Sequence, residues 1–132
     1  MATLTPTLTL ASSDTSGDTL NFTVTDSLTV NAPSVNASKI NVTNAGANNI
    51  IVPTGTAITY LYVKHTGVTE DGSTSTAQLV DIEDTASVAI ARLGAGEFAF
   101  FPANKGGADT GIQLQVNHAS QVQCEYAYWT KG

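Results

Sequence analysis

The two histidines are the residues whose chemistry first suggests catalysis or metal binding. His65 ends an apolar run, and His118 lies in a short connection near the C-terminus. A general base needs a neighbouring proton partner, and a metal site needs several converging ligands. Neither histidine has a carboxylate two residues further along. We therefore predict two solvated loop histidines, with no catalytic residue and no metal ligand.

Carboxylates form a second candidate cluster. Asp81, Glu83 and Asp84 lie within four residues, and Glu70 and Asp71 precede them in a Ser/Thr-rich segment. A calcium site needs about six or seven oxygen ligands, and the spacing typical of calcium-binding loops is absent here. The pattern favours a solvated acidic edge, with a calcium site in loop 66–77 as the alternative.

Two further motifs are predicted to be structural. Cys124 alternates in register with Val122 and Tyr126, which predicts a buried, inert thiol. The segment Gly94–Ala99 fits a loose dinucleotide-binding fingerprint, but that motif requires a following helix. The next residues, Phe100–Pro102, are typical of a strand. We therefore expect a turn at Gly94–Gly96 and no cofactor.

The elements that position these residues are predicted to be strands, because the dominant hydrophobic period is two. The pattern predicts an all-β protein, an antiparallel β-sandwich or jelly-roll-like fold of eight to ten short strands. The expected strands are Thr3–Leu10, Thr19–Val30, Lys39–Thr43, Asn49–Val52, Thr56–Thr66, Gln78–Asp84, Ser87–Leu93, Glu97–Phe101, Gly111–Asn117 and Ser120–Thr130.

Breaks in the pattern predict the domain organisation. We expect an N-terminal strand or arm with its linker in residues 1–18 and a single β-sandwich domain in residues 19–132. Asp26 falls on an otherwise inward face and predicts a bend there, while Pro33 predicts a loop over Asn31–Ser38. Pro102 is expected to end a strand. The residues expected to point inward from Thr19–Val30 are Leu20, Phe22, Val24, Leu28 and Val30.

Composition excludes several functional classes. The 132 residues include five basic and eleven acidic side chains, a net charge of −6, which argues against direct nucleic-acid binding. No apolar stretch approaches the roughly 20 residues of a membrane-spanning helix. The start of the chain lacks the features of a secretory signal, so synthesis in the cytosol is expected. The charged fraction is only 12%, about half of the ~25% typical of soluble domains.

The candidate interaction residues lie near the two ends of the chain. Leu4, Leu8 and Leu10 form one apolar face, and Pro6 removes a backbone donor from an edge. We predict a docking arm that adds a strand to a neighbouring subunit or capsid; the alternative is an edge strand folded against its own sheet. Trp129 follows Tyr128, so one of these rings must face away from the core. We expect Trp129 at a subunit interface, with a sugar-stacking platform as the alternative.

Five segments together resemble the small virion structural proteins of tailed bacteriophages, particularly marine and cyanobacterial ones. They are MATLTPTLTL at residues 1–10, YLYVKHTG at 60–67, GEFAFFP at 96–102, GIQLQ at 111–115 and EYAYWTK at 125–131. The resemblance implies a non-enzymatic capsid decoration (cement) protein on the virion surface, made in the host cytoplasm. Its implied partners are the major capsid protein and copies of itself, as a homotrimer.

A second functional class remains open at this stage. It is a tail or head-fibre module that binds a receptor or glycan, in which the loops at residues 66–77 and 102–110 would carry recognition. The number of copies per virion separates the two classes, because decoration proteins are present in hundreds of copies.

Overall fold

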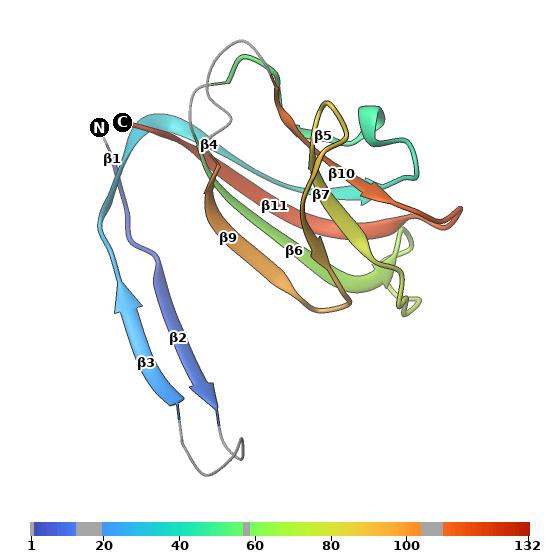
Figure 1. The fold of residues 1–132 in the computed structure, drawn as a ribbon, viewed down its shortest axis with the longest axis horizontal. Coiled ribbons are helices and arrows are strands. Elements are labelled where there is room, and N and C mark those ends of the chain that lie inside the picture. Colours follow the sequence, from blue (N-terminus) through green and yellow to red (C-terminus); the bar gives the residue numbers. More distant parts are fainter. Residues whose placement is uncertain (1, 13–19, 57–58, 104–109) are drawn as a thin grey trace.

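The computed structural model describes residues 2–12, 20–56, 59–103 and 110–132, and within them the chain forms eleven strands and no α-helix (Figure 1). Every strand pairing is antiparallel, which confirms the predicted all-β fold. The elements are β1 (Ala2–Leu4), β2 (Thr7–Ser12), β3 (Leu20–Thr25), β4 (Leu28–Val42), the 3-10 turn η1 (Gly46–Asn48), β5 (Ile50–Val52), β6 (Thr59–Thr69), β7 (Val80–Asp84), β8 (Ala89–Leu93), β9 (Phe98–Ala103), β10 (Ile112–Val116) and β11 (Val122–Lys131).

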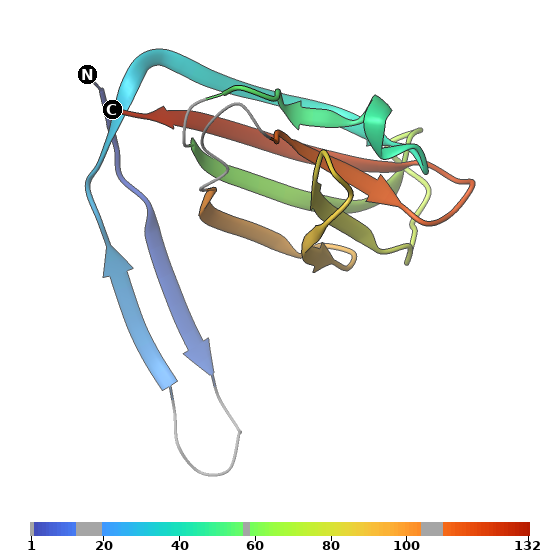
Figure 2. The same ribbon diagram turned by 45° about the horizontal axis from the view of Figure 1, so that its top comes forward.

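Two sheets pack face to face as a sandwich (Figures 1 and 2). The first has the order β1-β4-β11-β6-β9, and the second has the order β5-β10-β7-β8. Their facing side chains form one apolar core, because alternate residues of each strand point inward. The core residues are Val42, Ile51, Val52, Leu61, Val63, Val80, Ile82, Leu93, Ala103, Ile112, Leu114, Val116, Val122 and Cys124.

Strand β6 shows how the sequence pattern produces a central strand. It pairs with β11 on one side and with β9 on the other. Leu61 and Val63 are fully buried in the core, whereas Tyr60 and Tyr62 alternate with them on the outer face and are half-buried. The predicted alternation over Thr56–Thr66 is therefore confirmed for residues 59–66.

Two predicted breaks in the strands are wrong, both at prolines. The loop expected over Asn31–Ser38 belongs to the fifteen-residue strand β4. Its register with β11 slips between Trp129 and Lys131, and Pro33 lies in that irregularity, where no regular ladder bond is lost. Pro102 continues β9 instead of ending it. Strand β9 is an edge of its sheet, and an edge tolerates a missing N–H.

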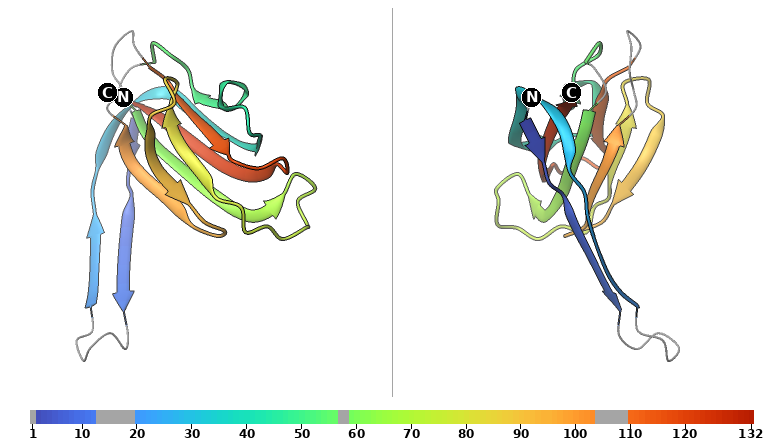
Figure 3. Two further views of the ribbon diagram at one scale, coloured as in Figure 1. Left: turned by 45° about the vertical axis from the view of Figure 1, so that its right-hand side comes forward. Right: turned by 90° about the vertical axis from the view of Figure 1, so that its left-hand side faces the viewer.

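Strands β2 and β3 leave the sandwich as a separate two-stranded hairpin (Figures 1 and 3). The predicted bend at Asp26 is present, between the end of β3 and the start of β4. The domain division predicted after residue 18 separates two strands that the structure pairs with each other. Residues 13–18 of the predicted linker lie outside the described residues, whereas Ala11 and Ser12 belong to β2.

Candidate functional site

The hairpin β2–β3, called the arm below, has one apolar and one polar face. Leu8 pairs with Val24 and Leu10 with Phe22, and residues directly opposite share a face. These four side chains are 44%, 54%, 41% and 40% exposed, respectively. Phe22 and Val24, predicted to point into the sandwich core, therefore do not.

The opposite face of the arm consists of paired threonines. Thr7 pairs with Thr25 and Thr9 with Thr23, and their hydroxyls lie 3.1 and 3.2 Å apart, within hydrogen-bond distance. Thr–Thr pairs stabilise neighbouring strands and keep that face compatible with water. The arm is thus an amphipathic ribbon whose apolar side is open.

A short hinge joins the arm to the sandwich. Leu4 pairs with Leu28 on the sandwich side of the hinge, and Thr7 pairs with Thr25 on the arm side. Between these pairs the Asp26 N–H donates to the Pro6 carbonyl at 3.2 Å. The Asp26 carboxylate also accepts from the Ser27 N–H at 2.7 Å. The two strands thus remain linked where the ribbon bends away from the sheet.

The outer face of the five-stranded sheet carries a row of aromatic side chains. The Tyr60 and Phe100 rings are stacked at 6.4 Å, and the Tyr62 and Phe98 rings lie 6.5 Å apart with a tilt of 39°. Phe98 is 59% and Phe100 37% exposed. Trp129 pairs with Tyr60 on this same face and is half-buried. The prediction that Trp129 faces away from the core is consistent with this register.

An apolar groove lies between the root of the arm and this outer face. One part, of about 270 Å³, is lined by Pro6, Leu8, Val24, Asp26, Leu28, Tyr60, Phe100 and Pro102. The adjoining part, of about 300 Å³, is lined by Pro6, Thr7, Leu8, Tyr62, Phe98 and Phe100. Both walls are mainly apolar, so the groove suits a hydrophobic protein segment.

The predicted interface residues occupy three different positions around this groove. Pro6 and Leu8 line it. Leu4 is half-buried in β1 opposite Leu28, and Leu10 is exposed further along the arm. Sequence reasoning identified one strand of the arm but assigned the other, β3, to the sandwich.

Basic side chains gather on the outer sheet face. Lys39 and Lys64 both lie opposite Glu125 in the strand register, and the Lys39 Nζ is 3.9 Å from the Glu125 carboxylate. The Lys131 Nζ lies 4.9 Å from the Tyr60 ring centroid, a cation–π contact. Among the described residues of this face, three lysines and one glutamate give a local positive charge on a chain of net charge −6.

The prediction of two solvated histidines is wrong for His65. It lies in β6 with the same inward parity as Leu61 and Val63 and is fully buried. Its Nε2–H donates to the Gln78 carbonyl at 2.8 Å, and its Nδ1 accepts from the Gly67 N–H at 2.9 Å. The Nε2 bond ties β6 to the segment before β7, and the Nδ1 bond lies within β6. His118 is exposed, as predicted.

The prediction of a solvated acidic edge is wrong for Glu83 and Asp84, which are both buried. The β7–β8 register slips at Ile82/Glu83, which disturbs the regular alternation of the two faces. Glu83 accepts from Gln113 Nε2 at 3.2 Å. Asp84 Oδ1 accepts from the Ala86 and Val88 N–H groups at 3.0 and 2.9 Å, which fixes the β7–β8 turn.

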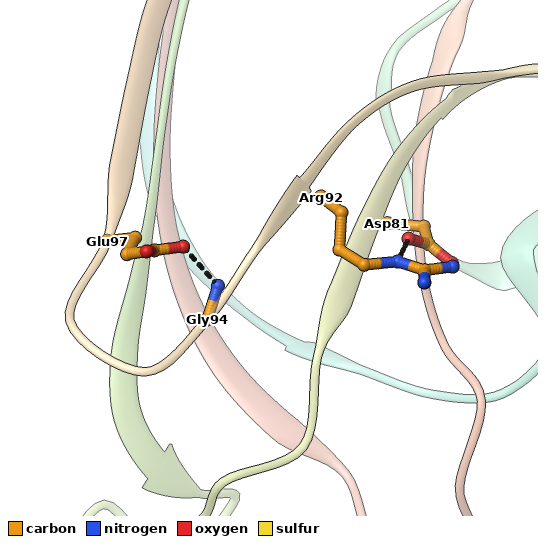
Figure 4. A network of polar contacts seen from close by, with 4 residues as sticks. All are labelled: Asp81, Arg92, Gly94 and Glu97. Carbon is orange, nitrogen blue, oxygen red and sulfur yellow. Dashed lines mark hydrogen bonds and ion pairs between the residues drawn. The ribbon is translucent and has the colours of Figure 1, made fainter.

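The remaining carboxylates near this sheet also have structural partners. Asp81 forms a two-bond ion pair with Arg92 on β8 (Figure 4). Hydrogen bonds from the Thr74 hydroxyl and from the backbone of Thr74 and Ser73 lower the pKa of Asp71 well below its usual value. Within the described part of the chain, no group of three or more His, Cys, Asp or Glu side chains is placed to hold a metal ion.

The other two motifs take the predicted structures. Cys124 is fully buried, and this burial raises the pKa of its thiol to about 12. Gly94–Gly96 forms the turn between β8 and β9, where the Gly94 N–H donates to the Glu97 carboxylate at 2.6 Å (Figure 4). Gly96 has a φ of 80°, a conformation that favours glycine.

A polar hollow of about 370 Å³ lies beside the second sheet. Its lining includes the Asp81–Arg92 pair together with Ala77, Gln78, Leu79 and Asn117. Unlike the groove, it offers amide, carboxylate and guanidinium groups, which suit a small polar ligand.

Comparison with protein-family models, with curated proteins and with solved structures found no match to this chain. Among the described residues, no helix has the length and apolar character that spanning a membrane requires.

Proposed function

We propose that this chain is a non-enzymatic structural protein of a bacteriophage particle, a decoration (cement) protein that stabilises the head. The observation that carries the proposal is the arm, whose apolar face projects from the sandwich and is open to solvent. A two-stranded ribbon is marginal on its own, and an exposed apolar patch marks an interaction site. The sequence resemblance supports the viral part of the proposal, and the arm supports the attachment part.

In this function the sandwich is the rigid body and the arm makes the contact. The arm and the adjoining groove bind apolar surface on the major capsid protein and on neighbouring copies, which links shell subunits at the virion surface. The low charge fraction of 12% favours such a role, since few charged groups must lose water when neighbours cover the body.

Binding to heads tests this proposal. Purified protein is added to phage heads that lack it, and bound protein is measured by co-sedimentation and imaged by electron microscopy. We expect hundreds of copies at regular positions on the shell, and increased resistance of the heads to heat. A few copies confined to a tail or fibre, or no binding, would contradict it.

The second candidate is a receptor- or glycan-binding module of a tail or head fibre. The polar hollow at Gln78, Asp81, Arg92 and Asn117 favours it, because sugar hydroxyls pair well with amide and carboxylate groups. A glycan array separates the candidates. Binding that is lost in Asn117→Ala but kept in His118→Ala, an exposed neighbour, would support the fibre module.

A further inference from the structure

The outer half of the arm projects beyond the groove of its own chain. Its groove contacts come from the root of the arm, at Pro6, Leu8 and Val24. Leu10 and Phe22 lie further from the hinge, and the arm diverges from the sandwich in every view (Figures 1, 2 and 3). Each of these two side chains is about 40% exposed. The described residues of their own chain leave them open, so they are available for contact with another chain.

We propose that the outer sheet face of a second copy of the same protein makes this contact, so that neighbouring copies exchange arms. The apolar face of one arm, at Leu10 and Phe22, packs on Phe98 and Phe100 of the next copy. This inference rests on the assembly role proposed above and names the partner of the arm. Since donor and acceptor surfaces differ, each copy both gives an arm and receives one, and the exchange closes into a ring.

Charge favours a second copy as the occupant. Residues 1–27 contain no lysine or arginine and three aspartates: Asp26 at the hinge, and Asp14 and Asp18, which fall between β2 and β3 in the sequence and outside the described residues. Among the described residues, the outer sheet face carries Lys39, Lys64 and Lys131 with Glu125, and Asp26 lines the groove beside it. Two whole copies, each of net charge −6, repel each other, but the arm and the outer face attract. Such complementarity orients partners and selects against other contacts.

The apolar area favours the same occupant. The arm offers Leu8, Leu10, Phe22 and Val24, and the outer face offers Phe98 and Phe100; all six are more than a third exposed. Together they present on the order of 500 Å², near the upper end for a single patch on a monomer. A stable interface buries about 1,600 Å² in total; a two-copy exchange makes this contact twice, so the patches supply about 1,000 Å² of it.

The first experiment measures mass in solution by sedimentation velocity and light scattering. The wild type is expected at two or more copies of the 13.6 kDa chain. The arm variant, Leu10→Asp with Phe22→Asp, is expected to be monomeric, its self-association at least about a hundredfold weaker. These side chains are exposed, so the sandwich should fold normally; cooperative unfolding and an unchanged β-type circular dichroism spectrum check this.

A matched control replaces two other exposed apolar residues by aspartate, at positions away from the arm and the groove. Val88→Asp with Ile90→Asp places two charges at exposed apolar positions of the second sheet, away from the groove. This control is expected to keep the wild-type mass. Equal loss of assembly in the control and the arm variant would overturn the proposal.

The second experiment tests exchange directly by mixing. The face variant, Phe98→Asp with Phe100→Asp, is expected to be monomeric alone, like the arm variant. Together they should form a one-to-one dimer, because the intact arm of one meets the intact outer face of the other. No pairing in the mixture, with both variants folded, would overturn arm exchange.

The outcomes separate this inference from the proposed function. A wild type that is monomeric at all concentrations, or whose oligomer is unaffected by the arm variant, overturns arm exchange. Decoration of heads by that protein would nevertheless support the proposed function. An arm-exchanged oligomer that binds no head supports the inference and contradicts decoration.

Discussion

Strands β2 and β6 both alternate apolar and polar residues, yet the structure uses them in opposite ways. In β6 the inward residues Leu61 and Val63 are fully buried between the sheets. In β2 the equivalent residues, Leu8 and Leu10, are more than 40% exposed on the arm. A period of two therefore specifies which residues share a face but not what covers that face.

Truncation of one leucine in the sandwich core and one on the arm should give the largest difference in the free energy of unfolding. Leu114→Ala removes a fully buried side chain from the core and is expected to lower the free energy of unfolding by about 3–5 kcal/mol. Leu10→Ala on the arm should lower it by about 0.5 kcal/mol or less in a monomer, since the side chain is already solvated. Urea denaturation of both variants measures this. Equal losses would mean that the arm is covered within its own chain.

The fold was largely predictable from sequence because each β-strand in a half-buried sheet leaves an alternating pattern. The strands of the sandwich and the inward position of Cys124 follow from it. The prediction for His65 is wrong because it places this residue near the end of a strand, whereas β6 continues to Thr69. His65 is two residues after Val63 and four after Leu61, so in a continuing strand it shares their buried face. This spacing is the sequence signal for its burial.

The arm and the buried carboxylates were harder to predict, for different physical reasons. Val24 and Phe22 have a pattern identical to that of a core strand, and only the pairing of β3 with β2 takes them away from the sandwich. Glu83 and Asp84 are buried around an irregular β7–β8 register, which no alternation rule anticipates. The phage role and the capsid partner stay predictions.

A pH series should show how the buried Cys124 thiol contributes to the stability of the core. Burial raises the pKa of Cys124 from 9.0 to about 12, so the folded protein keeps its proton where the unfolded chain loses it. The stability that this thiol contributes is complete below pH 9 and is lost between pH 9 and 12, by about 4 kcal/mol at most. Cys124→Ala should lose stability less steeply over this range, measured by urea denaturation at each pH.

The same thiol also reports the state of the core. At neutral pH, a thiol reagent should modify Cys124 slowly in the native protein and rapidly in denaturant. The arm variant described above should protect Cys124 as well as the wild type does. Faster modification in that variant would show that the arm contributes to the integrity of the core.

Truncation of a polar side chain in the sandwich and of one on the arm should give a smaller difference in the free energy of unfolding. The Asn49 amide donates to the carbonyls of Thr43, Ala45 and Leu114 in a buried site. Asn49→Ala removes these hydrogen bonds, together with the Asn49 Oδ1 that accepts from the Thr43 N–H, and should lower the free energy of unfolding by about 2–3 kcal/mol. Thr9→Ala on the arm removes one exposed hydroxyl contact and should change it by about 0.5 kcal/mol or less. Thermal and urea denaturation of both variants measure the contrast.

Removal of the whole arm should have only a small effect on the sandwich. The Asp26 N–H and the Pro6 carbonyl lie within hydrogen-bond distance at the hinge, so a two-residue Asn-Gly turn can replace residues 7–25. Strand β1 still pairs with β4, and the fourteen residues of the core cluster remain. We therefore expect a change of about 1 kcal/mol or less in the unfolding free energy of the monomer, together with loss of self-association.

A variant that unfolds would show that the arm stabilises its own sheet. A variant that folds and still assembles would show that other surfaces join the copies. Only a stable monomer fits a region whose apolar face is covered by a neighbouring chain.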